Sequence, residues 1–359
     1  MRQSTAPRPS PTLLDVARAA GVSRTTVSNA FNRPDQLSAA LRDKVLGVAR
    51  ELGYAGPNPM ARMLRTGRAG AIGVVFSDRL TYAVTDPATV PFLEGIALVC
   101  DQEDAALLIL SAVDENAARR VVRQAAVDGF IIYCLTTETG VINAILERGG
   151  PVVAVDEPGF ADAPGVGIAD RAGARRAAEH LLGLGHRRIA ILSMETRPDG
   201  YAGPLDAARR AGSIYAVTDE RLAGYEEALE AAGVDLTALR VEERPWIRPR
   251  SARDAALALL AERPRPTAIL AMSDVFALAA IDAAKELGLR VPDDLSVVGF
   301  DDIPIASQVS PPLTTVHQPL VEKGRIAAEL LFGRREAAGP IVLPTRLLVR
   351  GSTAPPAPA

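Results

Sequence analysis

Short apolar runs alternate with stretches of helical period from about residue 70 to residue 300. Strands that alternate with helices in this way pair in parallel through right-handed crossovers, so the pattern predicts an α/β body. The expected strands are 71–76, 106–110, 129–134, 151–155, 188–192, 268–272 and 296–300. The expected helices are 115–127, 171–184, 221–232, 251–262 and 275–288.

Polar residues follow several of these runs at the point where each strand should end. Ligands of parallel sheets bind beyond the carboxyl ends of the strands. We therefore expect a ligand to meet the residues at these ends, which are Ser77, Asp156, Ser273, Asp274, Asp301 and Asp302.

The N-terminal stretch 12–32 has a different pattern, that of two short helices around a tight turn. Thr12 and Asp15 form a variant of the capping box and place a helix start near residue 13. Gly21 suits the left-handed backbone of a sharp turn, and Ser23 can cap a second helix. These features predict a helix-turn-helix. An ordinary helical hairpin in a larger α-helical domain is the alternative.

The second helix of a helix-turn-helix enters the major groove, and side chains near its N-terminus meet base edges. Here those side chains are Arg24 and Thr25, with Asn29 one turn further along. We expect contacts to the DNA backbone from Ser23 and Ser28. A third amphipathic helix, from residue 38 to about residue 52, would complete a small headpiece.

A short basic segment follows the headpiece. Asn58 can cap a helix that begins at Pro59 and runs for about two turns, which is marginal alone in water. Arg62 and Arg65 suit contacts to phosphates, and Leu64 could wedge between bases in a minor groove. The segment is therefore predicted to be a conditional hinge helix. A plain basic linker is the alternative.

The distribution of charge agrees with a DNA-binding N-terminus. Residues 1–70 carry a net charge of +7, whereas the rest of the chain carries −10. A positive module binds the phosphate backbone, and an acidic body does not wrap nucleic acid. The 48% hydrophobic content of the 359 residues is enough for two or three domains with full cores.

The composition also predicts the compartment. The two cysteines, Cys100 and Cys134, lie far apart in apolar contexts and indicate neither a disulfide framework nor a metal knuckle. We find no signal-peptide pattern and no apolar segment of about 20 residues that could span a membrane. A cytoplasmic protein with no membrane partner is therefore expected.

Catalytic motifs are missing from the sequence. There is no G-x-S-x-G elbow, P-loop or H-E-x-x-H zinc motif. His180 and His186 are poorly spaced for a shared metal and suit capping and packing, whereas His317 could form a hydrogen bond near a domain crossing. We therefore predict a binding protein with no catalytic residues, no metal and no cofactor.

Segments along most of the chain resemble the lactose-repressor (LacI/GalR) family of bacterial transcription regulators. The N-terminal ones are T-L-L-D-V-A-R-A-A-G-V-S-R-T-T-V-S-N-A-F-N (12–32), V-L-G-V-A-R-E-L-G-Y (45–54) and P-N-P-M-A-R-M-L-R (57–65). The later ones are A-E-H-L-L-G-L-G-H-R-R-I-A-I-L (178–192), R-L-A-G-Y (221–225), V-P-D-D-L-S-V-V-G-F-D-D (291–302) and P-P-L-T-T-V-H-Q-P (311–319).

The resemblance implies a homodimer that binds a near-palindromic double-stranded operator, with paired hinge helices in the minor groove and Leu64 intercalated. It also implies a body of two Rossmann-like lobes with the periplasmic-binding-protein architecture. The lobes would be joined by three crossings, near residues 167–169, near 317–318 and near Gly339. No heptad segment follows residue 333, which favours a dimer over a tetramer.

The resulting domain organisation has an all-α headpiece and an α/β two-lobe body. Lobe 1 would comprise about 70–168 and 318–338, and lobe 2 about 169–317 and 339–351. The full prediction is a disordered leader at 1–11, the headpiece at 12–56, the hinge helix and linker at 57–69, the effector-binding and dimerisation core at 70–351 and a loose tail at 352–359.

By resemblance, six residues of the body face a small-molecule effector between the lobes, and Ser77 joins them as a strand-end residue. Carboxylates and guanidinium groups there suit hydroxyl groups of a carbohydrate, and a tryptophan gives a sugar ring an apolar wall. Ser273 stands where the family commonly has Asn, which argues against a simple hexose. The six are Asp156, Arg221, Trp246, Ser273, Asp301 and Gln318.

Structural alternatives exist for four of these residues. Trp246 could be exposed or pack a lobe, Arg221 could form a surface ion pair at a helix N-terminus, and Asp156 and Asp301 could cap helices or turns. Segments 78–90 and 195–219 look like insertions against the family pattern. They either shape specificity at the mouth of the cleft or are loop padding.

The sequence thus predicts a transcription regulator, most simply a repressor, whose operator affinity changes when the effector binds. It does not separate an inducer from a co-repressor. Two other classes of protein share part of this pattern. A solute-binding protein of a transporter would share the two-lobe body but lacks a basic headpiece, and a cleft enzyme with an autoregulatory DNA-binding module would need catalytic residues.

Overall fold

The computed structural model describes residues 11–57, 63, 67–135, 139–157, 163–245 and 249–357. The chain forms two compact units, Met1–Ala69 and Gly70–Ala359. The predicted hinge helix falls on residues outside the described ranges, apart from Met63.

The headpiece is the predicted three-helix unit. Thr12 and Asp15 cap the first helix reciprocally, and Gly21 ends it with a φ of 65°. Ser23 and Ser38 cap the next two helices by accepting backbone N–H groups. The elements are α1 (Leu13–Ala20), α2 (Arg24–Asn32), η1 (Pro34–Gln36) and α3 (Ala39–Leu52).

A small apolar core holds these helices together. Val16, Val27 and Val45, one from each helix, are fully buried. Tyr54 packs edge-on against Phe31 with ring centroids 5.7 Å apart, so it is a structural residue. Leu52 lies on the last turn of α3, and its side chain is 40% exposed.

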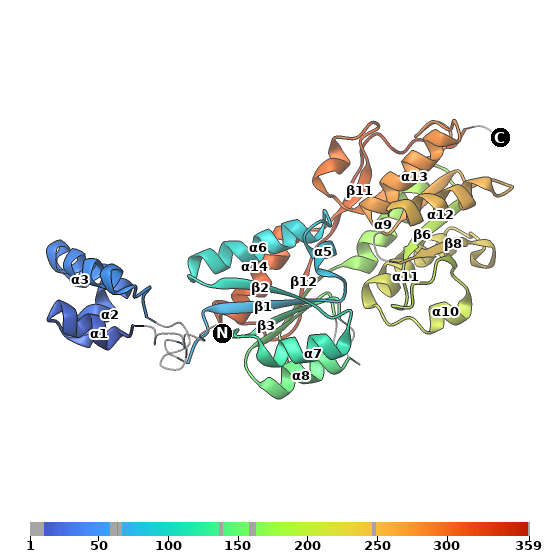
Figure 1. Ribbon diagram of the computed structural model, residues 1–359. Helices are drawn as coiled ribbons and strands as arrows, with labels where there is room; N and C mark the ends of the chain where they lie inside the picture. Colours follow the sequence, from blue (N-terminus) through green and yellow to red (C-terminus); the bar gives the residue numbers. More distant parts are fainter. Residues whose placement is uncertain are drawn as a thin grey trace, which may run out of the picture. The chain divides into compact units, whose positions relative to one another are not determined.

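Lobe 1 is built on a six-stranded sheet of order β12-β5-β4-β3-β1-β2 in which every pair is parallel. Neighbouring residues of its strands point to opposite faces: Val74 packs beneath helices α6 and α14, whereas Val75 packs beneath α7 and α8 (Figure 1). The strands are β1 (Ala71–Phe76), β2 (Ala106–Ser111), β3 (Phe130–Tyr133), β4 (Val152–Val155), β5 (Gly165–Ile168) and β12 (Ile341–Leu343). The helices are α5 (Leu80–Ala83), α6 (Thr89–Gln102), α7 (Glu115–Gln124), α8 (Gly140–Arg148) and α14 (Leu320–Leu331).

Lobe 2 repeats this plan on a seven-stranded sheet of order β13-β11-β10-β9-β6-β8-β7, whose two edge strands are antiparallel. Its strands are β6 (Ile189–Met194), β7 (Gly203–Pro204), β8 (Arg240–Arg244), β9 (Ala268–Ala271), β10 (Ser296–Asp301), β11 (Thr314–His317) and β13 (Arg346–Leu348). Its helices are α9 (Asp170–Gly183), α10 (Ala207–Ala211), α11 (Ala216–Ala231), η2 (Leu236–Ala238), α12 (Pro249–Ala261), α13 (Asp274–Glu286) and η3 (Pro304–Ser307). In the described ranges, no helix combines the length and apolar content needed to cross a membrane.

The chain passes between the lobes three times. The first two crossings, at Ala169 and at residues 318–319, lie where the sequence predicts them. The third was predicted near Gly339 but falls at residues 344–345, because β12 still pairs with β5 of lobe 1. The following strand, β13, then pairs with β11 of lobe 2.

The predicted loose tail is ordered in its first residues. Ser352 is fully buried, and its hydroxyl donates to the Val297 carbonyl. His186 lies within hydrogen-bond distance of the Ala354 carbonyl, and His180 lies 2.9 Å from the hydroxyl of Thr353. The tail therefore packs on lobe 2, and these two histidines have the packing role that their spacing indicates.

Two glycines bring α6 and α14 into direct backbone contact. A Cβ atom at Gly95 would lie 2.0 Å from the carbonyl oxygen of Val321, and one at Gly324 would lie 2.0 Å from the carbonyl oxygen of Phe92. Because the obstructing atoms belong to the backbone, no side-chain rotation can relieve either clash.

We predict that Gly95→Ala lowers the free energy of unfolding of the body by at least about 1–3 kcal/mol, the usual cost of overpacking. Gly183→Ala is the matched control, since the Cβ at this helical glycine meets no atom within 4 Å. Urea denaturation of both variants measures the difference. Equal stabilities would contradict the contact between the helices.

Candidate functional site

The carboxyl ends of β3, β4 and β10 converge on a small cavity between the lobes, here called the inner cavity. Its volume is about 30 Å³, room for roughly one water molecule. Five of the predicted effector residues lie together on its wall. They are Asp156, Arg221, Ser273, Asp301 and Gln318.

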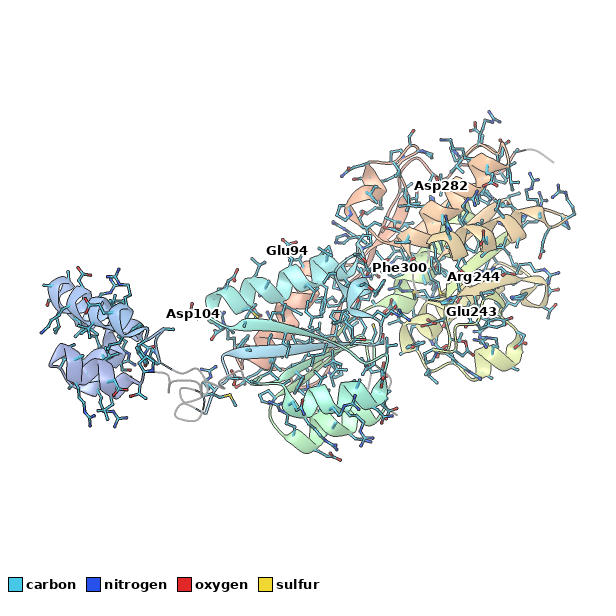
Figure 2. All side chains as sticks on the ribbon, viewed as in Figure 1. Glu94, Asp104, Glu243, Arg244, Asp282 and Phe300 are labelled. Carbon is cyan, nitrogen blue, oxygen red and sulfur yellow. The ribbon has the colours of Figure 1, made fainter. Side chains whose placement is uncertain are left out.

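Arg221 is the central cation of lobe 2 at this cavity. Its Nε atom donates to Asp170 at 2.7 Å, and its Nη1 atom donates to the Met272 carbonyl at 2.5 Å and approaches Asp301 at 3.5 Å. The guanidinium group also lies 3.6 Å from the ring centroid of Phe300, a residue labelled in Figure 2. Burial acts to lower the pKa of Arg221, but the two carboxylates outweigh it and raise that pKa.

The surface ion pair considered for Arg221 is therefore wrong. Helix α11 begins at Ala216 and not at residue 221, so Arg221 lies in the second turn and faces the protein interior. Ser273 has a structural role in addition to its place at the cavity. The Ser273 hydroxyl caps α13 by accepting the Phe276 N–H group, yet it also lines the cavity.

A chain of hydrogen bonds joins the two lobes through the second crossing. The side-chain amide of Gln318 donates to Asp301 of lobe 2 at 2.6 Å, and its oxygen accepts from the Lys323 ammonium group at 3.0 Å. Lys323, on α14 of lobe 1, pairs in turn with Asp156. We call the series from Arg221 through Asp301, Gln318 and Lys323 to Asp156 the polar relay.

Two carboxylate oxygens at the inner cavity are buried without a hydrogen-bond partner. They are Oδ1 of Asp86 and Oδ1 of Asp156. A buried polar atom left unpaired costs about 1–3 kcal/mol, and more when it is charged. The cavity is thus short of hydrogen-bond donors, and a hydroxyl or amine group would supply them.

The backbone around the inner cavity is strained. Cys134, Asp156 and Asp301 follow or end their strands with φ values of 51°, 57° and 121°, in the region that side chains rarely adopt. Such conformations cost about 1–3 kcal/mol each and cluster at ligand sites. Here they turn the strand ends so that the two aspartates face the cavity.

Burial controls the protonation of the acidic groups at the cavity. It raises the pKa of Asp301 to about 7, against the opposing charge of Arg221. Burial also raises the pKa of Asp86, although the Thr89 hydroxyl and N–H groups donate to its Oδ2 atom. Burial together with the Asp86 charge raises the pKa of Tyr82.

Ser77, the remaining described residue of the predicted set, does not reach the inner cavity. It lines a second, larger space of about 600 Å³, which we call the outer chamber. Both predicted insertions, 78–90 and 195–219, contribute to the chamber wall, as expected for segments at the mouth of the cleft. Trp246 lies outside the described residues.

Four further residues that line or support the inner cavity were not predicted from the sequence: Lys323, Asp170, Tyr82 and Asp86. Lys323 is only 1% exposed, and no local pattern marks it because its partner Asp156 lies 167 residues away. Asp170 could have been found as the first helical residue after a crossing. Tyr82 and Asp86 lie in an insertion for which the family pattern offers no template.

The headpiece presents its predicted DNA contacts on α2. Arg24 and Thr25 are exposed. The side-chain amide of Asn29 donates to Gln36 at 3.2 Å. Two other predicted DNA contacts already have local partners. The Ser23 hydroxyl caps α2 by accepting the Thr26 N–H group, and the Ser28 hydroxyl accepts from the Asn32 side-chain amide. Asn58, Arg62, Leu64 and Arg65 lie outside the described residues.

Metal-ligand clusters do not occur in the part of the chain that the structure describes, where no three His, Cys, Asp or Glu side chains gather suitably. Both cysteines are buried and free. His317 lies 2.9 Å from Asp302, beside the second crossing as predicted. The arrangement suits reversible binding of a small polar molecule.

We predict that Lys323→Met destabilises the body by about 3–5 kcal/mol, because it leaves the buried Asp156 charge without its partner. The double variant Lys323→Met with Asp156→Asn should regain most of this loss, since both charges are removed together. Urea denaturation of the two variants tests the pair. A double variant no more stable than the single one would show that Lys323 contributes mainly through packing.

The pH dependence of stability should change when Glu157 is replaced. Burial and the neighbouring Asp156 charge raise the pKa of Glu157 to about 7. The folded protein therefore binds this proton more tightly than the unfolded chain, and stability falls as pH rises from about 4.5 to 7. Glu157→Gln removes this slope, so its stability relative to the wild type should increase between pH 5 and pH 8.

Urea denaturation at several pH values measures this difference. Glu147→Gln, at an exposed position of α8, is the control. A constant difference between Glu157→Gln and the wild type across the range would contradict the prediction.

Comparison with known proteins covers both units of the chain. The family described as "Bacterial regulatory proteins, lacI family" matches residues 12–58, and the "Periplasmic binding protein-like domain" matches residues 178–353. The HTH-type transcriptional regulator Rv3575c of Mycobacterium tuberculosis (strain ATCC 25618 / H37Rv) is 43% identical over 359 residues. That alignment covers 98% of this chain and 99% of the relative.

Solved structures agree with this assignment. The lac repressor dimer bound to operator and the anti-inducer ONPF is 29% identical, with a TM-score of 0.75, over 96% of this chain and all of the other. The complex of the transcriptional regulator CelR with cellobiose is 30% identical, with a TM-score of 0.67, over 95% and 99% of the two chains. The capped helix-turn-helix, the two crossed lobes and the full-length relatives lead to one conclusion. The chain belongs to the lacI family of bacterial regulatory proteins, and is a DNA-binding transcription regulator and not an enzyme.

Proposed function

We propose that this regulator is a repressor whose operator affinity is changed by a carbohydrate effector bound between its lobes. The observation that carries the proposal is the pair of unpartnered carboxylate oxygens, on Asp86 and Asp156, inside a cavity that both lobes line. Neutral hydroxyl groups are donors of the kind these oxygens lack. The cellobiose complex of CelR supports this class of ligand.

The polar relay gives the effector a way to act on the whole body. Asp156 ends the relay in lobe 1 and also faces the inner cavity. A ligand hydroxyl group that donates a hydrogen bond to Asp156 competes with Lys323 for this carboxylate, and through Gln318 it changes the contact to Asp301 of lobe 2. If the ligand changes the affinity for the operator, the operator changes the affinity for the ligand by the same factor. The corresponding coupling free energy is typically about 1–3 kcal/mol.

The proposal for DNA rests on the exposed start of α2 and on the net charge of +7 in residues 1–70. We assign base readout to Arg24, Thr25 and Asn29. A homodimer would place two such helices on a near-palindromic operator, and the operator-bound lac repressor dimer supports this arrangement. Contacts to the backbone and minor groove are assigned to Ser23, Ser28, Asn58, Arg62, Leu64 and Arg65. The regulator would act at the nucleoid, in the bacterial cytoplasm.

The experiment that tests this function measures operator binding with and without sugars. Duplexes selected from a random pool by the purified protein give the operator, and fluorescence anisotropy gives its Kd at two salt concentrations. We expect a near-palindromic sequence, a strong salt dependence and a Kd that shifts when an effective sugar is added. A selected sequence without symmetry would refute the dimer, and a Kd insensitive to every sugar would refute the carbohydrate effector.

Replacement of Arg24 tests its readout role. Arg24→Ala should cost about 1–3 kcal/mol on the selected operator and relax the preference at one position of each half-site. Arg62→Ala should instead weaken all sequences about equally and reduce the salt slope. Binding to a set of singly substituted operators measures both effects. An equal loss on every operator for Arg24→Ala would reassign Arg24 to the backbone.

A further inference from the structure

Tyr82 lines both the inner cavity and the outer chamber. The two spaces differ greatly in size, at about 30 Å³ and about 600 Å³. Small-molecule sites usually measure about 300–1,000 Å³. With the side chains where they are, the outer chamber can hold a small molecule, whereas the inner cavity holds little more than a water.

The wall that segment 195–219 gives to the chamber is anchored in the lobe 2 core. Glu243 of β8 is fully buried and accepts the N–H and hydroxyl groups of Thr196 at 2.8 and 2.9 Å. It also accepts two hydrogen bonds from Arg209 of α10, each of 2.8 Å (Figure 2 labels Glu243). Arg209 reaches on to Asp199 and lies 3.8 Å from the ring centroid of Tyr201. The segment is thus held in place by buried hydrogen bonds and ion pairs.

The opposite wall, from lobe 1, is fixed in a similar way. Glu115 of α7 accepts the backbone N–H group of Gly140 at 3.0 Å, which ties the start of α7 to the start of α8. Thr139, beside it, has a buried hydroxyl oxygen without a hydrogen-bond partner and lines the chamber. The chamber therefore has two anchored walls and one buried hydroxyl group, that of Thr139, without a hydrogen-bond partner.

The chemistry of the lining favours a neutral ligand rich in hydroxyl groups. Carboxylates outnumber cations among the described lining residues, with Asp78, Glu115 and Glu195 against Arg79. A phosphate group would be repelled by this surplus of negative charge. Apolar side chains lie between these polar groups, which suits the apolar faces and hydroxyl edges of sugar rings. They include Val113, Leu135, Val141 and the rings of Tyr82 and Tyr215.

We propose that the outer chamber is a sugar subsite and that the effector is a neutral oligosaccharide of at least two rings. This inference rests on the proposed function and names the size and charge of its ligand. One ring occupies the outer chamber against Tyr82, and the next ring extends toward the donor-poor inner cavity. Free monosaccharides fill too little of the chamber, and phosphorylated sugars are excluded by charge.

Isothermal titration of the full chain with glucose, cellobiose, maltose, trehalose and trehalose 6-phosphate tests the proposal. We expect one or more of the neutral disaccharides to bind at least about tenfold more tightly than glucose, and trehalose 6-phosphate to bind no better than glucose. Glucose binding as tightly as every disaccharide would overturn the proposal. Binding by none of the three disaccharides, or tighter binding of trehalose 6-phosphate than of trehalose, would also overturn it.

A pair of tryptophan variants places the bound disaccharide. Val113 is 53% exposed and lines the chamber, so Val113→Trp narrows the chamber without disturbing the core. Val121, 44% exposed on α7, is absent from the chamber lining, and Val121→Trp is the matched control. Val113→Trp should raise the Kd for the disaccharide by at least about tenfold, and Val121→Trp should raise it by less than about twofold. Equal Kd values for both variants would overturn the subsite.

Operator binding measured on the same proteins separates this inference from the proposed function. Both variants should bind the operator normally without sugar, because neither lies in the headpiece. A protein that binds the operator and responds to glucose alone would keep the repressor function and lose the subsite. A protein that binds a disaccharide in the chamber but no operator would keep the subsite and lose the repressor function.

Discussion

The hydrogen bond from Gln318 to Asp301 is the contact on which the arrangement of the body depends. It joins the second crossing to the end of β10, and the Lys323 ammonium group holds the other side of the same amide. The neutral amide of Gln318 lies between the Lys323 ammonium group of lobe 1 and the Asp301 carboxyl group of lobe 2. These two groups therefore both lie near the cleft and are bridged by the amide. These directional bonds help to hold one lobe against the other, and a polar ligand can compete for them.

The same region combines strain, unpaired oxygens and raised pKa values. Strand ends with positive φ angles turn Asp156 and Asp301 into the cavity, and burial favours the neutral form of Asp301. None of these features increases the stability of the folded body. A binding site, however, needs groups that gain partners only when a ligand arrives. The cost in stability is offset by the two apolar cores of lobe 1 and the large core of lobe 2.

Local patterns in the sequence were enough to predict the headpiece and most strands, because helix caps and apolar periodicity depend on residues that are close together in the sequence. The carboxyl ends of strands also led directly to Asp156, Ser273 and Asp301, because parallel sheets place such ends on one edge. Long-range pairing was not predictable in this way. The Lys323 and Asp156 partnership spans 167 residues, and the third crossing depends on whether β12 pairs with β5 or continues to lobe 2. For the outer chamber, the sequence indicated only the two insertions that contribute to its wall and did not predict its shape or volume.

The route of the chain has a consequence for synthesis. Lobe 1 begins at β1 but needs α14 and β12, which come near the end of the chain, to cover and complete its sheet. Lobe 2 needs β13 and the packed residues 352–354, which come later still. The headpiece, by contrast, has its own core within residues 13–54, which precede both lobes in the chain. During translation the DNA-binding unit can therefore fold early, whereas the sensor that governs it is complete only when the last strand has left the ribosome.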